Sequence, residues 1–200
     1  MFGKRSAVGD PRQAGLALGA PDEARLIAKI AQKDPRAFEA LYRLYHPRLT
    51  RFLRNFISRP GMVEEVLDDT LMVVWDGAER YNGQSKVSTW IFAIAYRKGL
   101  SARRRQDEPM EDRDAELRAS DAPTPEQALG QTDTQRVLRG ALDELSADHR
   151  MVVDLTYFHD LGYRDIAQIM ECPVDTVKTR MFHARRHLKR VLSGELADWL

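Results

Sequence analysis

The sequence predicts an all-α protein of two small helical domains joined by a flexible acidic linker. Apolar residues recur at helical spacing in both halves of the 200 residues, no segment of the first half alternates like a β-strand, and an acidic, proline-containing stretch interrupts the apolar pattern. We expect a disordered tail at 1–21, a first domain at 22–106, the linker at 107–131, a second domain at 132–193 and a tail at 194–200.

The linker is predicted from its composition. Between Asp107 and Glu126 the chain carries eight acidic residues and two arginines, a net charge of −6. The stretch contains Pro109, Pro123 and Pro125 and almost no large apolar residue, so it cannot bury a core of its own. The net charge of the whole chain is only +1, which argues neither for nor against a nucleic-acid partner.

The first domain is predicted to begin with a long helix after Asp34. Asp34 is a suitable N-cap, and Pro35 suits the first helical position. Pro47 falls inside the helix, so we expect a kink or a restart there. The predicted buried stripe of this helix comprises Phe38, Leu41, Tyr42, Tyr45, Leu49, Phe52, Leu53 and Phe56.

Two further helices complete this domain. One is expected at about 62–78, with one apolar and one acidic face. The other is expected to begin at Ser88 or Thr89 and to end in the arginine run 103–105. The polar segment 81–86 lies between them. The predicted buried face of the earlier helix comprises Val63, Val66, Leu67, Leu71 and Val74.

The second domain shows the order of a helix-turn-helix. A helix is expected around 137–145, and Ser146 caps another that runs to about Phe158. A short helix at 162–170 and a turn at 171–173 then lead into a long basic helix. This succession predicts a helix-turn-helix.

The basic final helix is the candidate DNA reader, because the second helix of such a motif can lie in the major groove. Candidates to reach base edges are Asp175, Thr176, Lys178, Thr179, Arg180 and His183. Arg185 and Arg186 are better placed to bind phosphate. The alternative interpretation is a basic amphipathic helix that stays solvated, with a buried stripe of Val174, Val177, Met181, Ala184 and Leu188.

The acidic face at 62–78 needs a separate explanation. Glu64 and Asp68 are four residues apart, as are Glu65 and Asp69, and each like-charge pair destabilises an isolated helix by roughly a few tenths of a kcal/mol. The positive end of the helix dipole compensates only Glu64 and Glu65, which lie in the first turn. A basic protein surface would complete the compensation, whereas the alternative is an ordinary solvated acidic face.

Three segments resemble an extracytoplasmic-function (ECF) sigma factor of the sigma-70 family of bacterial RNA polymerase. They are EEVLDDTLMVVW at 64–75, YNGQSKVSTW at 81–90 and YRDIAQIMECPVDTVKTRMFHARRHL at 163–188, and the resemblance extends from about Asp22 to Leu192. It implies a sigma-two domain followed by a sigma-four domain. It also implies a protein that is not an enzyme, has no catalytic residues, metal or cofactor, and directs promoter recognition, DNA opening and transcription initiation.

The resemblance also implies roles for individual residues. Glu64, Glu65, Asp68 and Asp69 would dock on the clamp helices of the polymerase beta-prime subunit. The final helix would read the minus-thirty-five element, and the second domain would meet the beta flap. Residues expected to bind the opened minus-ten strand are the loop residues Asn82, Gly83, Gln84, Ser85 and Lys86, which receive a flipped base, and Tyr96, Arg97, Arg103 and Arg104, which hold the backbone.

A further partner follows from the same resemblance, and the compartment follows from the composition. An anti-sigma factor is an expected partner, and no membrane insertion is expected. The single cysteine, Cys172, fits a reducing cytoplasm. The chain departs from relatives at Tyr96 and Arg97, where an Arg-Asn pair is common, at Ser101, where Asp is common, and at Glu171, where Gly is frequent, so its minus-ten preference stays open.

Two rival functions remain open at this stage. A regulator that binds duplex DNA without polymerase would explain only the second domain. A magnesium-dependent nuclease would need carboxylates that converge on an ion, which one helical face does not supply. Three weaker candidates remain. His183 and His187 have the spacing of a metal site, but surface roles are favoured for them. A redox role for Cys172 and phosphorylation of Thr70 are also possible functions, but a packed role is favoured for Cys172 and a buried role for Thr70.

Overall fold

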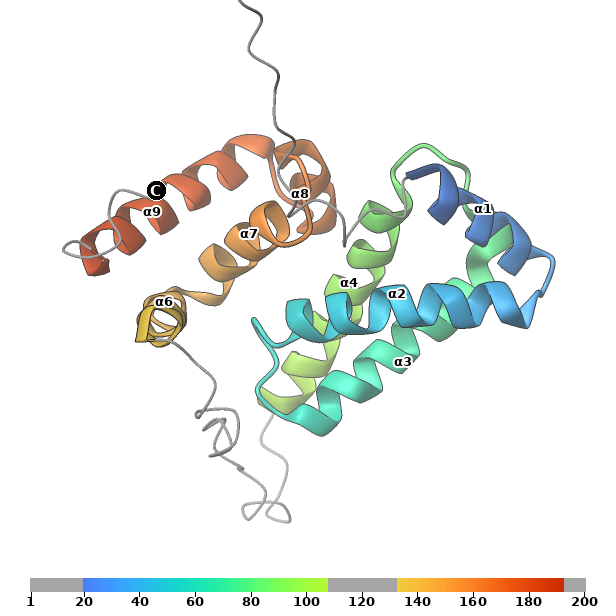
Figure 1. Cartoon of the computed structure of the whole chain (residues 1–200), viewed down its shortest axis with the longest axis horizontal. Coiled ribbons are helices and arrows are strands. Elements are labelled where there is room, and N and C mark those ends of the chain that lie inside the picture. The colour runs from blue at the N-terminus through green and yellow to red at the C-terminus, as the bar shows by residue number, and fades with distance from the viewer. Residues whose placement is uncertain (1–19, 108–132, 193–200) are drawn as a thin grey trace, which may run out of the picture.

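The computed structural model describes residues 20–107 and 133–192, and every regular element in these stretches is a helix (Figure 1). The all-α prediction is therefore confirmed. The predicted tails and linker fall almost entirely outside the described residues, apart from Ala20, Pro21 and Asp107 at their margins.

The described residues 20–107, which we call the first half, form four α-helices and one short 3₁₀-helix. They are α1 (Ala20–Ala31), α2 (Pro35–Leu53), α3 (Pro60–Gly77), η2 (Ala78–Arg80) and α4 (Val87–Asp107). Helix α4 packs against both α2 and α3, and α1 packs across α2 and η2 (Figure 1). The helices at 60–77 and 87–107 correspond to those predicted, with ends shifted by one to a few residues.

Helix α1 was not predicted. Its Ile27 and Ile30 are buried, and its Glu23 lies 3.2 Å from the guanidinium of Arg48 on α2. The two isoleucines are three residues apart, which is helical spacing, and Pro21 precedes them at the start of the helix. These signals could have identified the helix.

The start of α2 follows the prediction. Asp34 Oδ1 accepts hydrogen bonds from the backbone N–H groups of Arg36, at 2.9 Å, and Ala37, at 3.4 Å. Of the two outcomes expected at Pro47, a kink or a restart, the restart is wrong, because α2 continues through the proline to Leu53. Burial of successive turns on both sides of the proline holds this helix together.

Aromatic rings fill the middle of the first half. Phe92 of α4 meets Phe52 of α2 edge-on, with ring centroids 5.2 Å apart, and Phe56 packs edge-on against Phe52 at 5.5 Å. The predicted stripe of α2 is buried, with Phe38 and Tyr42 only partly covered, and the predicted apolar face of α3 is buried throughout.

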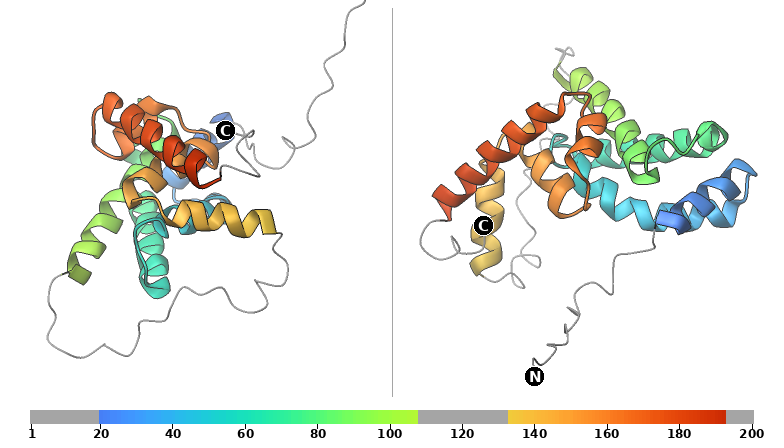
Figure 2. Two further views of the ribbon diagram at one scale, coloured as in Figure 1. Left: turned by 90° about the vertical axis from the view of Figure 1, so that its left-hand side faces the viewer. Right: turned by 90° about the horizontal axis from the view of Figure 1, so that it is seen from above.

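The described residues 133–192, which we call the second half, form α6 (Asp133–Asp143), α7 (Ala147–Tyr157), α8 (Tyr163–Ile169) and α9 (Val174–Val191). Ser146 caps α7 as predicted, since its Oγ accepts from the backbone N–H of His149 at 3.4 Å. Helices α8 and α9 form the predicted helix-turn-helix (Figure 2). In the turn between them, Glu171 adopts a left-handed backbone with φ of 50°.

The two halves contact each other, chiefly through α4 and α8 and also through α2 and α7. Arg51 of α2 donates from Nε to Asp154 Oδ1 of α7 at 2.6 Å, and the Asp154 side chain is only 5% exposed. His159 lies against the Phe92 ring, with centroids 4.6 Å apart, and its Nε2 is 3.1 Å from Asp154. A buried polar cluster therefore joins the halves.

We predict opposite effects on stability for two glycine-to-alanine changes. A Cβ at Gly99 of α4 would lie 2.5 Å from the Phe56 ring, whereas nothing lies within 4 Å of a Cβ at Gly140 of α6. Gly99→Ala should therefore lower the free energy of unfolding by about 1–3 kcal/mol, and Gly140→Ala should raise it by up to about 1 kcal/mol. Urea unfolding followed by circular dichroism measures both. Stabilisation by Gly99→Ala would contradict the close packing of α4 on Phe56.

Candidate DNA- and protein-binding surfaces

Helix α9 presents a basic face to solvent. The apolar stripe of α9 that was predicted to be buried is buried in the structure, except that Val174 at its start is only partly buried. Thr176 and Arg180 are half-buried, and the other candidate base- and phosphate-contacting residues are exposed: Asp175, Lys178, Thr179, His183, Arg185 and Arg186. The structure thus brings this set to one outer surface of the second half.

Arg180 has a structural partner within the chain. Its guanidinium donates to the Asp148 carboxylate of α7 and lies 3.7 Å from the Sγ of Cys172 in the turn. These contacts hold α9 against α7, so Arg180 is less available to DNA than its exposed neighbours. Burial raises the pKa of the Cys172 thiol despite the nearby Arg180, which is the opposite of the acidified thiol that a redox sensor needs.

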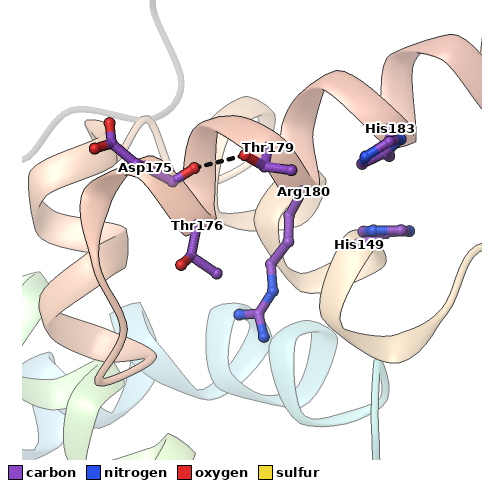
Figure 3. A pocket seen from close by; sticks show the side chains of 6 residues that line it. All are labelled: His149, Asp175, Thr176, Thr179, Arg180 and His183. Atoms are coloured by element: carbon purple, nitrogen blue, oxygen red, sulfur yellow. Dashed lines mark hydrogen bonds between the residues drawn. The ribbon is translucent and has the colours of Figure 1, made fainter.

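A groove of about 330 Å³ runs beside α9 (Figure 3). His149, at the start of α7, forms one wall of it, although the sequence analysis did not single this residue out. The ring centroids of His149 and His183 are 6.1 Å apart. Burial lowers the pKa of His149, and the neighbouring His183 and Arg180 lower it further. The groove is lined by His149, Asp175, Thr176, Thr179, Arg180 and His183.

Phe182 is a second residue that the sequence analysis missed. Its side chain is 61% exposed and lies on the outer face of α9 among basic residues. Phe182 immediately follows the buried Met181, and a helical projection places it outside the stripe. Nearby, Tyr157 Oη accepts hydrogen bonds from both Nε and Nη2 of Arg185, at 3.2 and 2.9 Å. The surface therefore combines aromatic and cationic groups.

The four acids of α3 are all exposed and form a ridge, which we call the acidic crest: Glu64, Glu65, Asp68 and Asp69. Lys98 of α4 donates to Asp69 at 2.9 Å and compensates part of this charge inside the chain. The His46 ring of α2 lies 3.2 Å from Glu64. These partners flank the crest on both sides and leave its outer edge open to solvent.

Two apolar side chains extend the acidic crest toward the end of α3. Met72 is 52% exposed and Val73 is 37% exposed. Adjacent exposed apolar and charged groups are typical of a surface that contacts another protein. These two residues were not identified from the sequence, because the helical periodicity of apolar residues predicts burial in the core.

The loop between η2 and α4 is held by its own contacts. Tyr81 Oη donates to the carbonyl oxygen of Ser85 at 2.5 Å, and Asn82 Oδ1 accepts from the backbone N–H of Gln84 at 3.1 Å. Gly83 has φ of 72°, which suits glycine. The Tyr81 and Trp90 rings pack against each other, with centroids 5.2 Å apart, and are partly buried against the core. Exposed polar groups therefore project from an ordered loop.

Other residues expected to bind the minus-ten strand lie against the second half. Lys86 Nζ and Thr89 Oγ1 both donate to the carboxylate of Asp165 in α8, at 3.1 and 3.0 Å. Arg97 lies 3.4 Å from Glu171. Tyr96 is nearly buried, and this burial raises its pKa. Arg103 and Arg104 lie farther along α4 and are exposed.

The weaker candidates also have definite surroundings. Thr70 is fully buried and donates to the carbonyl oxygen of Val66, as favoured from the sequence. His187 Nε2 lies 3.2 Å from Glu144. Across residues 20–107 and 133–192, histidine, cysteine and carboxylate side chains nowhere gather in groups of three or more suited to a metal ion. In the same residues, no helix is both long and apolar enough to cross a membrane.

Comparisons with known proteins place both halves in one family. The family models for sigma-70 region 2 and sigma-70 region 4 match residues 41–108 and 135–188. The ECF RNA polymerase sigma-E factor of Haemophilus influenzae is 28% identical over 82% of this chain and 92% of its own length. The chain is an extracytoplasmic-function sigma factor of the sigma-70 family. It is an alternative sigma factor that directs transcription initiation, and sigma factors are regulators of transcription rather than enzymes.

Solved structures agree with this assignment. The sigma factor RpoE of Bartonella quintana, in complex with the anti-sigma factor NepR, is 30% identical with a TM-score of 0.64, covering 79% of this chain and 98% of that one. CnrH, in complex with the cytosolic domain of CnrY, shares the fold at 22% identity with a TM-score of 0.61, and the match covers 87% of this chain and 99% of that one.

A second sequence relative agrees as well. The RNA polymerase sigma-H factor of Pseudomonas aeruginosa is 26% identical over 87% of this chain and 95% of its own length.

Two arginines of α9 should differ in their effect on the stability of this sigma factor. Arg180→Ala leaves Asp148 without its guanidinium and should lower the free energy of unfolding by about 1 kcal/mol. Arg186→Ala alters an exposed side chain and should change the same free energy by less than about 0.5 kcal/mol. Urea unfolding of both variants tests this, and equal effects would show that the Arg180 pair is not structural.

Proposed function

We propose that this sigma factor docks on core RNA polymerase through the acidic crest. The observation that carries this proposal is the ridge of four exposed carboxylates on α3, continued by the exposed Met72 and Val73. A basic helical surface, such as the clamp helices of the beta-prime subunit, would complete the charge compensation that Lys98 begins. The second half would meet the beta flap.

The two promoter elements are assigned to separate surfaces in this proposal. The loop residues from Asn82 to Lys86 would receive a flipped base of the minus-ten strand, because exposed amide and hydroxyl groups can read its hydrogen-bonding edge. Tyr96, Arg97, Arg103 and Arg104 would hold that strand. The exposed face of α9 would read the minus-thirty-five duplex, where Phe182 offers an apolar contact for a thymine methyl group.

The packing of the two halves adds a step to the proposed function. Because Lys86 and Arg97 pair with α8 and its turn and Tyr96 is buried, the second half would move away before these three residues could all bind the minus-ten strand. An anti-sigma factor that holds the halves together would keep the sigma factor inactive, and the relative from Bartonella quintana is known in complex with such a factor. We place the separation of the halves and its inhibition by an anti-sigma factor in the cytoplasm. The domain bounds in this proposal are near 22–106 and 132–193.

Transcription in vitro tests the proposed function. Core RNA polymerase with this chain should start transcription from genomic DNA at new sites that share two spaced upstream elements. A variant with Glu64→Gln, Glu65→Gln, Asp68→Asn and Asp69→Asn should lose these starts and fail to bind core polymerase, because the charges that pair with the clamp are gone.

The control is Asp76→Asn with Glu79→Gln, which removes two exposed acids just beyond the crest. This control should form holoenzyme at the wild-type level. Circular dichroism should show the same helix content in both variants. Holoenzyme formation by the crest variant would exclude the docking surface, and duplex DNA binding without new starts would favour a regulator that acts without polymerase.

Weakening the contact between the halves should favour binding of the minus-ten strand. Asp165→Ala removes the acceptor of both Lys86 and Thr89, so single-stranded DNA carrying the minus-ten element should bind about fivefold more tightly. Small-angle X-ray scattering should show a larger radius of gyration. Asp143→Ala is the matched control, because Asp143 pairs with Arg150 inside the second half. Equal strand affinity for the two variants would mean that α8 does not obstruct this surface.

A further inference from the structure

Two histidines from different helices face each other beside the exposed surface of α9. His149 lies in the first turn of α7, and His183 lies midway along α9. Their ring centroids are 6.1 Å apart and the ring planes differ by 32°. Figure 3 shows the two rings stacked across the space between the helices, next to the groove. Neither sequence spacing nor family resemblance pairs these residues.

The surroundings of this histidine pair are cationic, and most of the nearby acids already have partners. Asp148 accepts from Arg180, Asp175 from Lys178, and Glu144 lies 3.2 Å from His187. A second groove, of about 460 Å³, continues past His183 along α9. Its lining is cationic or titratable throughout: His183, Arg186, His187 and Arg190. An anion beside the pair would therefore meet mainly positive partners.

Electrostatics opposes protonation of His149 when nothing is bound. Two imidazolium rings about 6 Å apart repel each other. In agreement, the pKa of His149 is lowered first by burial, then by His183, Arg180 and His187, and Asp148 opposes this only in part. A bound anion would remove the repulsion and accept an N–H from each ring.

A phosphate of the DNA backbone has the charge and the acceptor oxygens that such a pair needs. The pair also borders the groove lined by Thr176 and Thr179, which lie on the helix assigned to the minus-thirty-five duplex. A duplex bound to that helix would carry its phosphates past the groove edge. The contact would be independent of sequence and would fix the position of the duplex.

We propose that His149 and His183 form a proton-linked site for one backbone phosphate of duplex DNA. The inference rests on the proposed DNA-binding role of α9 and extends it to a residue of α7. Binding of the upstream promoter element then takes up protons from solution. The sigma factor consequently binds its promoter more tightly as the pH falls below neutrality.

The direction of the effect follows from linkage. Phosphate raises the pKa of the histidines in the complex above their values in the free chain. Between these two values, the bound chain holds more protons than the free chain, so affinity increases as pH falls. Above the pKa of the complex both rings are neutral, and the contribution is lost. Below the pKa of the free chain, affinity no longer changes.

The experiment uses the full chain and a fluorescent duplex. The duplex is selected by the wild-type chain from a random-sequence pool at neutral pH, and a chelator excludes metal ions from the assay. Anisotropy should show roughly tenfold tighter binding on going from about pH 7.5 to about pH 6. His149→Gln and His183→Gln should each remove most of this change and leave the helix content intact.

Two further variants separate protonation from other effects. His149→Lys carries a permanent charge, so its affinity should stay high and nearly constant over the same range. His46→Gln alters a histidine of the first half and should keep the wild-type pH dependence. NMR signals of the His149 and His183 rings should titrate at higher pH with the duplex present, which a purely structural role would not cause.

The outcomes distinguish this inference from the function on which it rests. An unchanged pH dependence in both glutamine variants, or ring signals that titrate alike with and without duplex, would overturn the phosphate site and leave the minus-thirty-five role intact. Failure to select or bind any duplex at any pH would instead overturn the role of α9, and the inference with it.

Discussion

One buried carboxylate constrains how the two halves of this sigma factor fit together. Asp154 is 5% exposed, and a buried charge of this kind is tolerated only when it is paired. Its partners come from both halves, since Arg51 belongs to α2 and His159 follows α7 and packs under Phe92 of α4. The Arg51 guanidinium also lies 3.3 Å from the centre of the Phe158 ring. The cluster therefore joins the halves in one defined orientation.

This orientation separates the proposed binding surfaces by accessibility. The acidic crest and the outer face of α9 are exposed to solvent, whereas part of the surface proposed for the minus-ten strand is occupied by α8. In this arrangement the acidic crest and the outer face of α9 are open to a partner, while Lys86 and Arg97 are paired with the second half. The proposed surfaces therefore differ in how freely a partner can reach them.

Sequence patterns predicted the parts of the fold that depend on local burial. Helical periodicity located α2, α3, α4 and the helix-turn-helix, and the caps Asp34 and Ser146 were recognised because capping is a local interaction. Helix α1 was missed although its Leu26, Ile27 and Ile30 follow helical spacing. Of the kink or restart expected at Pro47, the restart was wrong because tertiary packing outweighs one lost backbone hydrogen bond.

The candidate sites were predictable in residue type but not in pairing. The acids of α3 and the bases of α9 are exposed as their patterns indicated. The pair Lys86 and Asp165, by contrast, is separated by 79 residues, and no periodic pattern connects such positions. The same holds for His149 and His183, which meet only because α7 packs on α9.

At the contact between the halves, the left-handed backbone of Glu171 is unfavourable, whereas its ion pair with Arg97 is at most weakly favourable. Its backbone conformation is unfavourable by roughly 1–2 kcal/mol relative to the right-handed region, while its pair with Arg97, exposed at both ends, contributes about 0–1 kcal/mol. The strain is present whether the halves are docked or apart, so it does not oppose docking, and the exposed Arg97 pair adds little in its favour. The orientation of the halves therefore depends on the buried Asp154 cluster and on the contacts of Asp165 rather than on this turn.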